Sequence, residues 1–147
     1  MLTALPATRV AIAALIPHQG AMCLLDCVER LDADSILCAS ATHRDNGNPL
    51  RRDGLLPAIA GVEYAAQAMA LHGALSDGEA QPIGFLSALR GLRLSVERLD
   101  DIAGPLAVTA TVEARERRGM IYGFTVSGGG RALLEGQAVV VLPERAP

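Results

Sequence analysis

The sequence has 147 residues, half of them hydrophobic, and a formal net charge of −3 at neutral pH. This length suits one compact domain over residues 1–147 with a sizeable core, and it leaves no room for a second domain. With only two Tyr, two Phe and no Trp, the chain has few aromatic side chains for stacking on bases, which argues against nucleic-acid binding.

The basic residues are unusual, because all thirteen are arginine. Bidentate Arg contacts suit phosphate groups or acidic partner helices, although ordinary solvated surface charge is the better explanation for any single one of them. Six of these arginines surround the central segment, namely Arg44, Arg51, Arg52, Arg90, Arg93 and Arg98.

The cysteines and the apolar runs indicate the cellular compartment in which the protein is expected. Cys23, Cys27 and Cys38 are odd in number and lack C-x-x-C spacing, so we expect neither a disulfide framework nor a metal site. A reducing cytoplasm fits this pattern best. The apolar run at residues 10–16 is too short to span a bilayer, so we expect no membrane association.

The first elements alternate between helix and strand. Residues 7–16 predict a short helix that ends at Pro17, because proline disfavours helical geometry in the residue before it. The apolar run 22–31 predicts a strand that enters the core, and residues 35–42 predict a second strand. A polar loop follows at residues 43–54, and long ordered loops are often functional.

The central segment, residues 57–75, is an Ala-rich, almost wholly apolar helix that carries a glutamate near its start. Glu63 and Gln67 lie one turn apart on the same face. A carboxylate inside an apolar helix is costly unless it is used or paired, which favours a catalytic role for Glu63. The alternative is a glutamate that only complements the helix dipole.

Beyond the helix the pattern changes to strands. The clearest strand is residues 106–115, where apolar and polar residues alternate. Further strands are expected at residues 83–97, 120–127 and 132–142, joined by turns at 116–119 and 128–130. The sequence therefore predicts an α+β domain in which a curved antiparallel sheet wraps a central helix.

Three stretches together resemble the β-hydroxyacyl-acyl-carrier-protein dehydratases, which have the hotdog fold. Residues 16–28, with His18 and Asp26, resemble the family's opening "PH-x-x-P-h-L-L-hydrophobic-D-x-V". Residues 57–67 resemble its "PG-hydrophobic-E-x-x-x-Q" helix, and residues 84–94 and 134–142 resemble its later sheet. Within the family, "HR-D-x-x-NPL-R" and "GVEYAAQAMA-x-HGAL" resemble the dehydratase-like subunits found with aryl-polyene pigment synthesis.

The resemblance implies roles for individual residues. Glu63 stands at the acidic catalytic position of the family. Pro57, Gly61 and Gln67 are candidate substrate-binding positions, although Gly61 also suits close helix packing and Gln67 suits a structural role beside Glu63. Backbone N–H groups at the start of the helix are suited to polarising a thioester carbonyl.

The catalytic histidine of the family is not where the resemblance requires it. The housekeeping enzymes place it in a "G-H-F-P-G" loop, eight residues before the proline that corresponds to Pro57. The residue at that distance is Pro49, and His43 lies six residues further upstream. His18 and His43 are therefore the candidate histidines of this chain, and His18 also suits a framework role.

Family members build each active site across a dimer interface, so a partner is able to supply the histidine. Our preferred hypothesis is a dehydratase subunit that acts on β-hydroxyacyl thioesters of acyl carrier protein, as a homodimer or with a second hotdog dehydratase subunit. No cofactor is expected beyond the carrier's phosphopantetheine arm, and no metal. The alternatives are a non-catalytic hotdog subunit that binds the carrier protein or a partner enzyme, and a hotdog thioesterase.

Overall fold

The structure is a computed structural model, and the residues it describes are 4–17, 20–77 and 85–141. Two α-helices and six strands form the domain, with three short 3-10 helices between them. In chain order the elements are α1 (Arg9–Ala13), η1 (Gly20–Met22), β1 (Cys27–Leu31), β2 (Ser35–Ser40), η2 (Thr42–Arg44), η3 (Ala58–Ala60), α2 (Gly61–Asp77), β3 (Phe85–Leu94), β4 (Leu106–Glu116), β5 (Gly119–Gly128) and β6 (Arg131–Val141).

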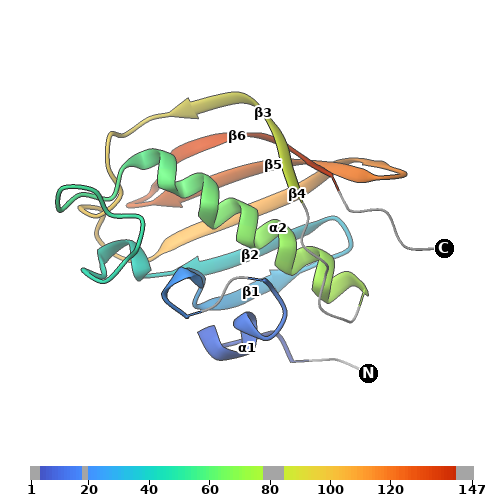
Figure 1. The fold of residues 1–147 in the computed structure, drawn as a ribbon, viewed down its shortest axis with the longest axis horizontal. Helices are drawn as coiled ribbons and strands as arrows, with labels where there is room; N and C mark the ends of the chain where they lie inside the picture. The colour runs from blue at the N-terminus through green and yellow to red at the C-terminus, as the bar shows by residue number, and fades with distance from the viewer. Residues whose placement is uncertain (1–3, 18–19, 78–84, 142–147) are drawn as a thin grey trace.

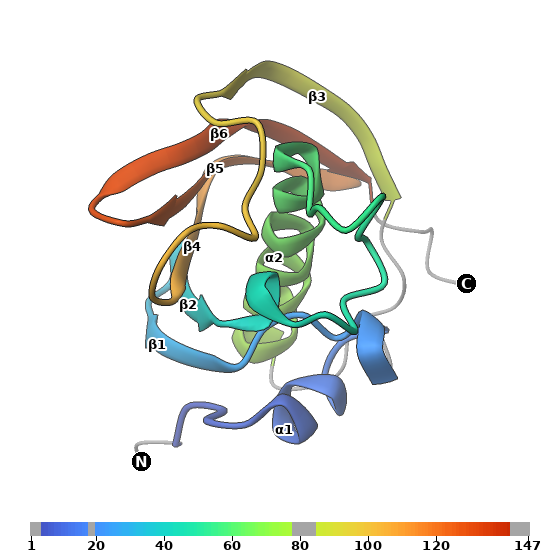
Figure 2. The same cartoon turned by 90° about the vertical axis from the view of Figure 1, so that its left-hand side faces the viewer.

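The six strands form one antiparallel sheet in the order β1-β2-β4-β5-β6-β3. Helix α2 follows β2 in the chain and lies across one face of this sheet (Figure 1). Turned by 90°, the sheet is seen to curl around α2, with β3 on one side of the helix and β1 on the other (Figure 2). This is the predicted architecture, a curved sheet wrapped around a central helix.

The alternation predicted for the central strand is present in β4. Leu106, Val108 and Ala110 are buried against the core, whereas Thr109 and Thr111 point to the opposite face. The same alternation continues in β5. The sheet therefore has an apolar face toward α2 and a polar outer face.

The hairpin between β5 and β6 turns on Gly129 and Gly130, both of which have positive φ, at 60° and 79°. Two consecutive residues with positive φ suit the right-handed twist of a two-residue hairpin, and glycine adopts them without steric cost. The predicted turn at 128–130 is thus confirmed.

One predicted strand begins later than expected. The run 22–31 was expected to be extended throughout, but β1 starts at Cys27. Leu24, which is buried, donates its N–H to Oε1 of Gln67 at 2.9 Å, and its carbonyl accepts from the hydroxyl of Thr42 at 2.8 Å. The backbone groups of Leu24 are therefore satisfied by side chains and not by a neighbouring strand. For this reason the first part of the apolar run is not part of the sheet.

Two boundaries also differ from the expectation. Helix α1 starts after Thr8, whose side chain caps the N–H of Ala11 at 3.2 Å, and it ends at Ala13 and not at residue 16. The last residues before Pro17 form a tighter turn, since the N–H of Leu15 donates to the carbonyl of Ile12. Strand β2 ends at Ser40, and the chain then turns into η2.

The core lies between α2 and the sheet. On α2 the sheet-facing side chains are fully buried, whereas Val62, Ala66 and Ala70 are only half-buried on another face. The largest fully buried side chains are Tyr64, Tyr122, Ile12, Leu24, Leu25, Ile36, Leu56, Leu71, Leu99, Leu106, Leu133 and Leu134. Within the part of the chain that the structure describes, no helix has both the length and the apolar character needed to cross a bilayer.

Candidate functional site

The start of α2 is held by a segment that follows β3. The N–H of Ala58 donates to the carbonyl of Glu97 at 3.0 Å, and the N–H of Leu99 donates to the carbonyl of Leu56 at 2.8 Å. Asp100 accepts the N–H of Leu56 at 2.8 Å through its carboxylate, which also pairs with Arg98. These bonds fix the position of the first helical turn relative to the sheet.

Asp100 is a strong anchor in this arrangement. Its side chain is 7% exposed. The hydrogen bonds from Arg98 hold the pKa of this carboxyl well below its usual range. It is therefore ionised at neutral pH and able to bind both Arg98 and the backbone before the helix.

Glu63 lies in the first turn of α2 and is half-buried. Its Oε1 accepts a hydrogen bond from Nε2 of Gln67 at 3.3 Å, so the structure brings together the two residues that the sequence placed on one face. A carboxyl at this position is both oriented by a neighbour and close enough to the surface for a substrate to reach it.

Gln67 is fully buried, and its amide makes three hydrogen bonds. Besides Glu63, Nε2 donates to the carbonyl of Met22 at 2.7 Å, and Oε1 accepts from the N–H of Leu24 at 2.9 Å. Both amide hydrogens are thereby used. The contacts made by Gln67 position Glu63 and tie the segment before β1 to the helix, while the predicted contact with substrate stays a prediction.

Gly61 and Pro57 lie immediately before this carboxyl. A Cβ on Gly61 would be 2.5 Å from Cδ2 of Leu134, so the glycine allows α2 to approach β6 closely. Pro57 is extended, with φ −65° and ψ 149°, and precedes η3. Gly61 thus packs against the sheet, whereas Pro57 is half-buried beside the helix start.

Of the two candidate histidines, His18 and His43, the structure describes only His43. His18 lies outside the described residues. His43 is fully buried in η2, and its Nε2–H donates to the carbonyl of Ile102 at 2.9 Å, which leaves Nδ1 without a partner among the described residues. Burial lowers the pKa of His43, so the neutral imidazole is favoured.

The direction of this imidazole bears on its predicted catalytic role. Its hydrogen-bonded nitrogen, Nε2, is directed to the carbonyl of Ile102. A base in this reaction needs a nitrogen with a free lone pair at the substrate, and the free nitrogen of His43, Nδ1, is buried. The catalytic role of His43 stays a prediction, and its observed contact is structural.

Sequence reasoning missed a buried polar network around Tyr64, the residue next to Glu63. The Tyr64 hydroxyl lies 2.8 Å from Oγ1 of Thr42 and accepts from Nδ2 of Asn48 at 3.0 Å. Asn48 also donates to the carbonyl of Thr42, and Ser40 bonds Thr42. The signal available in the sequence was the Asn-Pro pair of the polar loop, because buried asparagine requires such partners.

The other polar residues near the helix have internal partners. The Arg51 guanidinium donates to the carbonyls of Asp45 and Gly54 at 2.9 and 3.0 Å, which closes the loop on itself. His72 is buried, and its Nδ1 lies 2.9 Å from the Tyr122 hydroxyl. Among the described residues, no group of three His, Cys, Asp or Glu side chains is placed to hold a metal.

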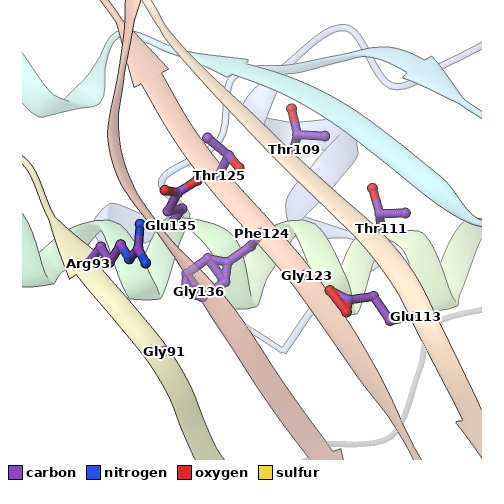
Figure 3. A pocket seen from close by; sticks show the side chains of 10 residues that line it. All are labelled: Gly91, Arg93, Thr109, Thr111, Glu113, Gly123, Phe124, Thr125, Glu135 and Gly136. Atoms are coloured by element: carbon purple, nitrogen blue, oxygen red, sulfur yellow. The ribbon is translucent and has the colours of Figure 1, made fainter.

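A hollow of about 480 Å³ lies on the outer face of the sheet, away from Glu63 (Figure 3). Threonine hydroxyls and the carboxylates of Glu113 and Glu135 point into it, and α2 lies behind the sheet in this view. Glu113 accepts a hydrogen bond from Gln137 at 2.8 Å. Because this face is the ordinary polar side of the sheet, the hollow is not part of the Glu63 site.

Solved structures share this fold. A chain of the dehydratase heterocomplex ApeI:P from Xenorhabdus doucetiae is 22% identical, with a TM-score of 0.79 over 91% of this chain and 91% of that one. AziG of S. sahachiroi is 15% identical, with a TM-score of 0.59 over 80% of this chain and 90% of that one. A thioesterase from Haemophilus influenzae is 12% identical, with a TM-score of 0.58 over 80% and 77%.

These neighbours confirm the predicted hotdog fold. A search of the curated proteins gave no match. The model of the ApeP-like family, described as ApeP dehydratase, matches residues 10–147 and so includes the helix with Glu63 and Gln67. The chain therefore belongs to the ApeP-like dehydratase family.

Proposed function

We propose that the chain is a subunit of a dehydratase that removes water from β-hydroxyacyl thioesters carried on acyl carrier protein, in aryl-polyene synthesis. The observation that carries this proposal is Glu63, half-buried in the first turn of α2 and bonded to Gln67. Membership of a dehydratase family supports the reaction type.

The reaction needs one base and one acid. The base removes a proton from the α-carbon, the electron pair forms the α–β double bond, and the β-hydroxyl leaves as water after it takes a proton from the acid. Glu63 supplies the acid. The histidine of a partner subunit supplies the base, because the nitrogen of His43 that has no hydrogen-bond partner among the described residues, Nδ1, is buried.

The partner proposed here is a second hotdog dehydratase subunit. Strand β3 ends the order of the sheet, so one of its edges has no neighbouring strand in the described residues. Leu86, Leu89 and Leu94 on this strand are 44%, 37% and 47% exposed, and Ile59 beside the helix start is 49% exposed. An open edge with exposed leucines is suited to pairing with another chain.

The heterocomplex that matches in structure supports this arrangement, since its name describes two kinds of dehydratase subunit. The substrate arrives on the carrier's phosphopantetheine arm, and the reaction itself takes no further cofactor. We place the complex in the cytoplasm, where the carrier protein acts. A reducing cytoplasm also keeps the thiols of Cys23, Cys27 and Cys38 free.

The test is dehydration of a β-hydroxyacyl carrier protein by this chain alone, by its hotdog partner alone and by the mixture. Glu63→Gln keeps the shape of the side chain and cannot donate the proton, so we expect the mixture to lose about 10²-fold or more of its kcat. Glu135→Gln, the same change at an exposed position on the outer face, is the matched control and retains activity.

The other outcomes separate the competing functions. Full activity of the Glu63→Gln mixture would make this chain a non-catalytic subunit. Release of the free acid in place of the enoyl thioester would identify a thioesterase. Dehydration by this chain alone would contradict the need for a partner histidine.

A further inference from the structure

A second hollow, of about 420 Å³, lies at the end of the sheet where β4 turns into β5. Three arginines and one carboxylate line it, namely Arg90, Arg117, Arg118 and Glu116. All four side chains are exposed. The strands contribute an apolar floor from Met120, Ile121, Val139 and Val140. We name this feature the arginine hollow.

The strand register explains why these arginines meet. Glu116 pairs with Gly119 across the hairpin, so Arg117 and Arg118 form the two-residue turn between β4 and β5. Arg90 arrives from β3, which pairs with β6 on the other side of β5. Two segments far apart in the sequence thus bring like charges to one place, which is unfavourable unless an anion balances them.

Arg9, Arg98 and Arg115 each form an ion pair within the chain. Arg115 pairs with Asp34 at 2.7 Å, and Arg98 pairs with Asp100. Within the described ranges, neither Arg90 nor Arg117 forms such an ion pair. In a chain of net charge −3, this local excess of positive charge is directed outward.

We propose that the arginine hollow is the surface on which an acidic face of the acyl carrier protein docks. This inference rests on the proposed function. The planar guanidinium groups match carboxylates and the phosphodiester of the carrier's arm in bidentate geometry. The apolar floor suits the centre of a protein interface, and the arginines suit its rim.

The place of the hollow relative to the catalytic carboxyls follows from the edge strand. At one end of β3, Phe85 pairs with Val141, which lines the hollow. At the other end, Leu94 pairs with Leu134, and Leu134 packs against Gly61 at the start of α2. If a second hotdog subunit pairs antiparallel with β3, the first turn of the partner's central helix lies near the Phe85 end of β3, beside the arginine hollow. A carrier docked here therefore serves the site across the interface.

The experiment uses the complex with its partner subunit and two substrates, a β-hydroxyacyl carrier protein and the same acyl group on pantetheine alone. In Arg117→Glu/Arg118→Glu, both in the turn between β4 and β5 and not on β3, we expect the KM for the carrier-linked substrate to rise about tenfold or more, because two attractive contacts become repulsive. The kcat and the turnover of the pantetheine thioester stay unchanged. The control is Arg30→Glu/Arg131→Glu, two exposed arginines elsewhere on the sheet.

Carrier binding is also measured directly by fluorescence anisotropy at low and high salt, with melting temperatures to confirm folding. The wild-type complex binds more weakly at high salt, and the hollow variant loses this salt dependence. Unchanged carrier affinity in the hollow variant overturns the docking site, as does an equal loss in the control. Absence of dehydration with intact binding overturns the proposed reaction and leaves the docking surface supported.

Discussion

At the scale of single residues, the buried imidazole of His43 makes the stability of the fold depend on pH. Its Nε2–H is used by the carbonyl of Ile102, so a second proton would sit on Nδ1, which has no acceptor among the described residues. Burial therefore lowers the pKa of His43 in the folded chain. Folding favours the neutral ring.

The expected consequence is a loss of stability in mild acid. Because the folded pKa lies below the unfolded value of about 6.5, the stabilisation is complete above that value and declines as the pH falls toward the folded pKa. We expect the free energy of unfolding to decrease between pH 7 and pH 5, and to decrease less in His43→Gln. Urea unfolding at each pH measures it, and equal slopes in the two proteins would contradict the assignment.

The titration of Asp100 does not contribute to the change in stability between pH 7 and pH 5. Its pKa is held well below the usual range by Arg98, so its contribution is present above the unfolded pKa of about 4 and is lost only as the pH falls further. The two effects are therefore separated by their pH ranges.

At the scale of elements, the contact between α2 and β6 depends on the absence of a side chain at Gly61. Gly→Ala usually stabilises a helix by up to about 1 kcal/mol. Here the new methyl group would lie 2.5 Å from a buried Leu134 carbon, so we expect Gly61→Ala to destabilise the fold by roughly 1–3 kcal/mol.

A double-mutant cycle checks the cause of this change. Leu134→Val removes the methyl groups that clash, so the cost of Gly61→Ala should be smaller in the Leu134→Val background than in the wild type. Denaturant unfolding of the four proteins gives the interaction energy. Strict additivity would mean that Leu134 is not the obstacle.

How well the sequence predicted the elements depended on which groups satisfied the backbone. Strand β4 was predictable because its alternation of apolar and polar residues reflects one buried face. The residues before β1 were not, because Gln67 and Thr42, distant in sequence, bind the backbone of Leu24. The pairing of Glu63 with Gln67 followed from helical spacing alone.

The hydrogen-bond partner of His43 could not be predicted from the sequence for a different reason. The polar loop suggested a functional histidine, but the direction of the imidazole is set by Ile102, which lies 59 residues further along the chain. Contacts of this range arise only once the sheet has assembled. The same holds for the role of Asp100 at the start of α2.

At the scale of the whole molecule, the exposed edge at β3 is the proposed site of association with a partner subunit. We expect Leu89→Glu to separate this chain from its hotdog partner, because a charge replaces an exposed leucine in the contact. Val10→Glu is the matched control, since Val10 is 82% exposed and lies on α1. Sedimentation velocity of the mixtures distinguishes them, and normal assembly of the Leu89→Glu chain would place the interface elsewhere.

The strand order also determines when the domain is able to fold during synthesis. Strand β2 pairs with β4, and β3 pairs with β6, whereas β4, β5 and β6 pair with their immediate neighbours in the chain. The last three strands can nucleate as local hairpins, and α2 leaves the ribosome after β1 and β2 but before β3, β4, β5 and β6. Helix α2 is thus made before most of the sheet that buries it, and its apolar face is fully covered only after the C-terminal strands have formed.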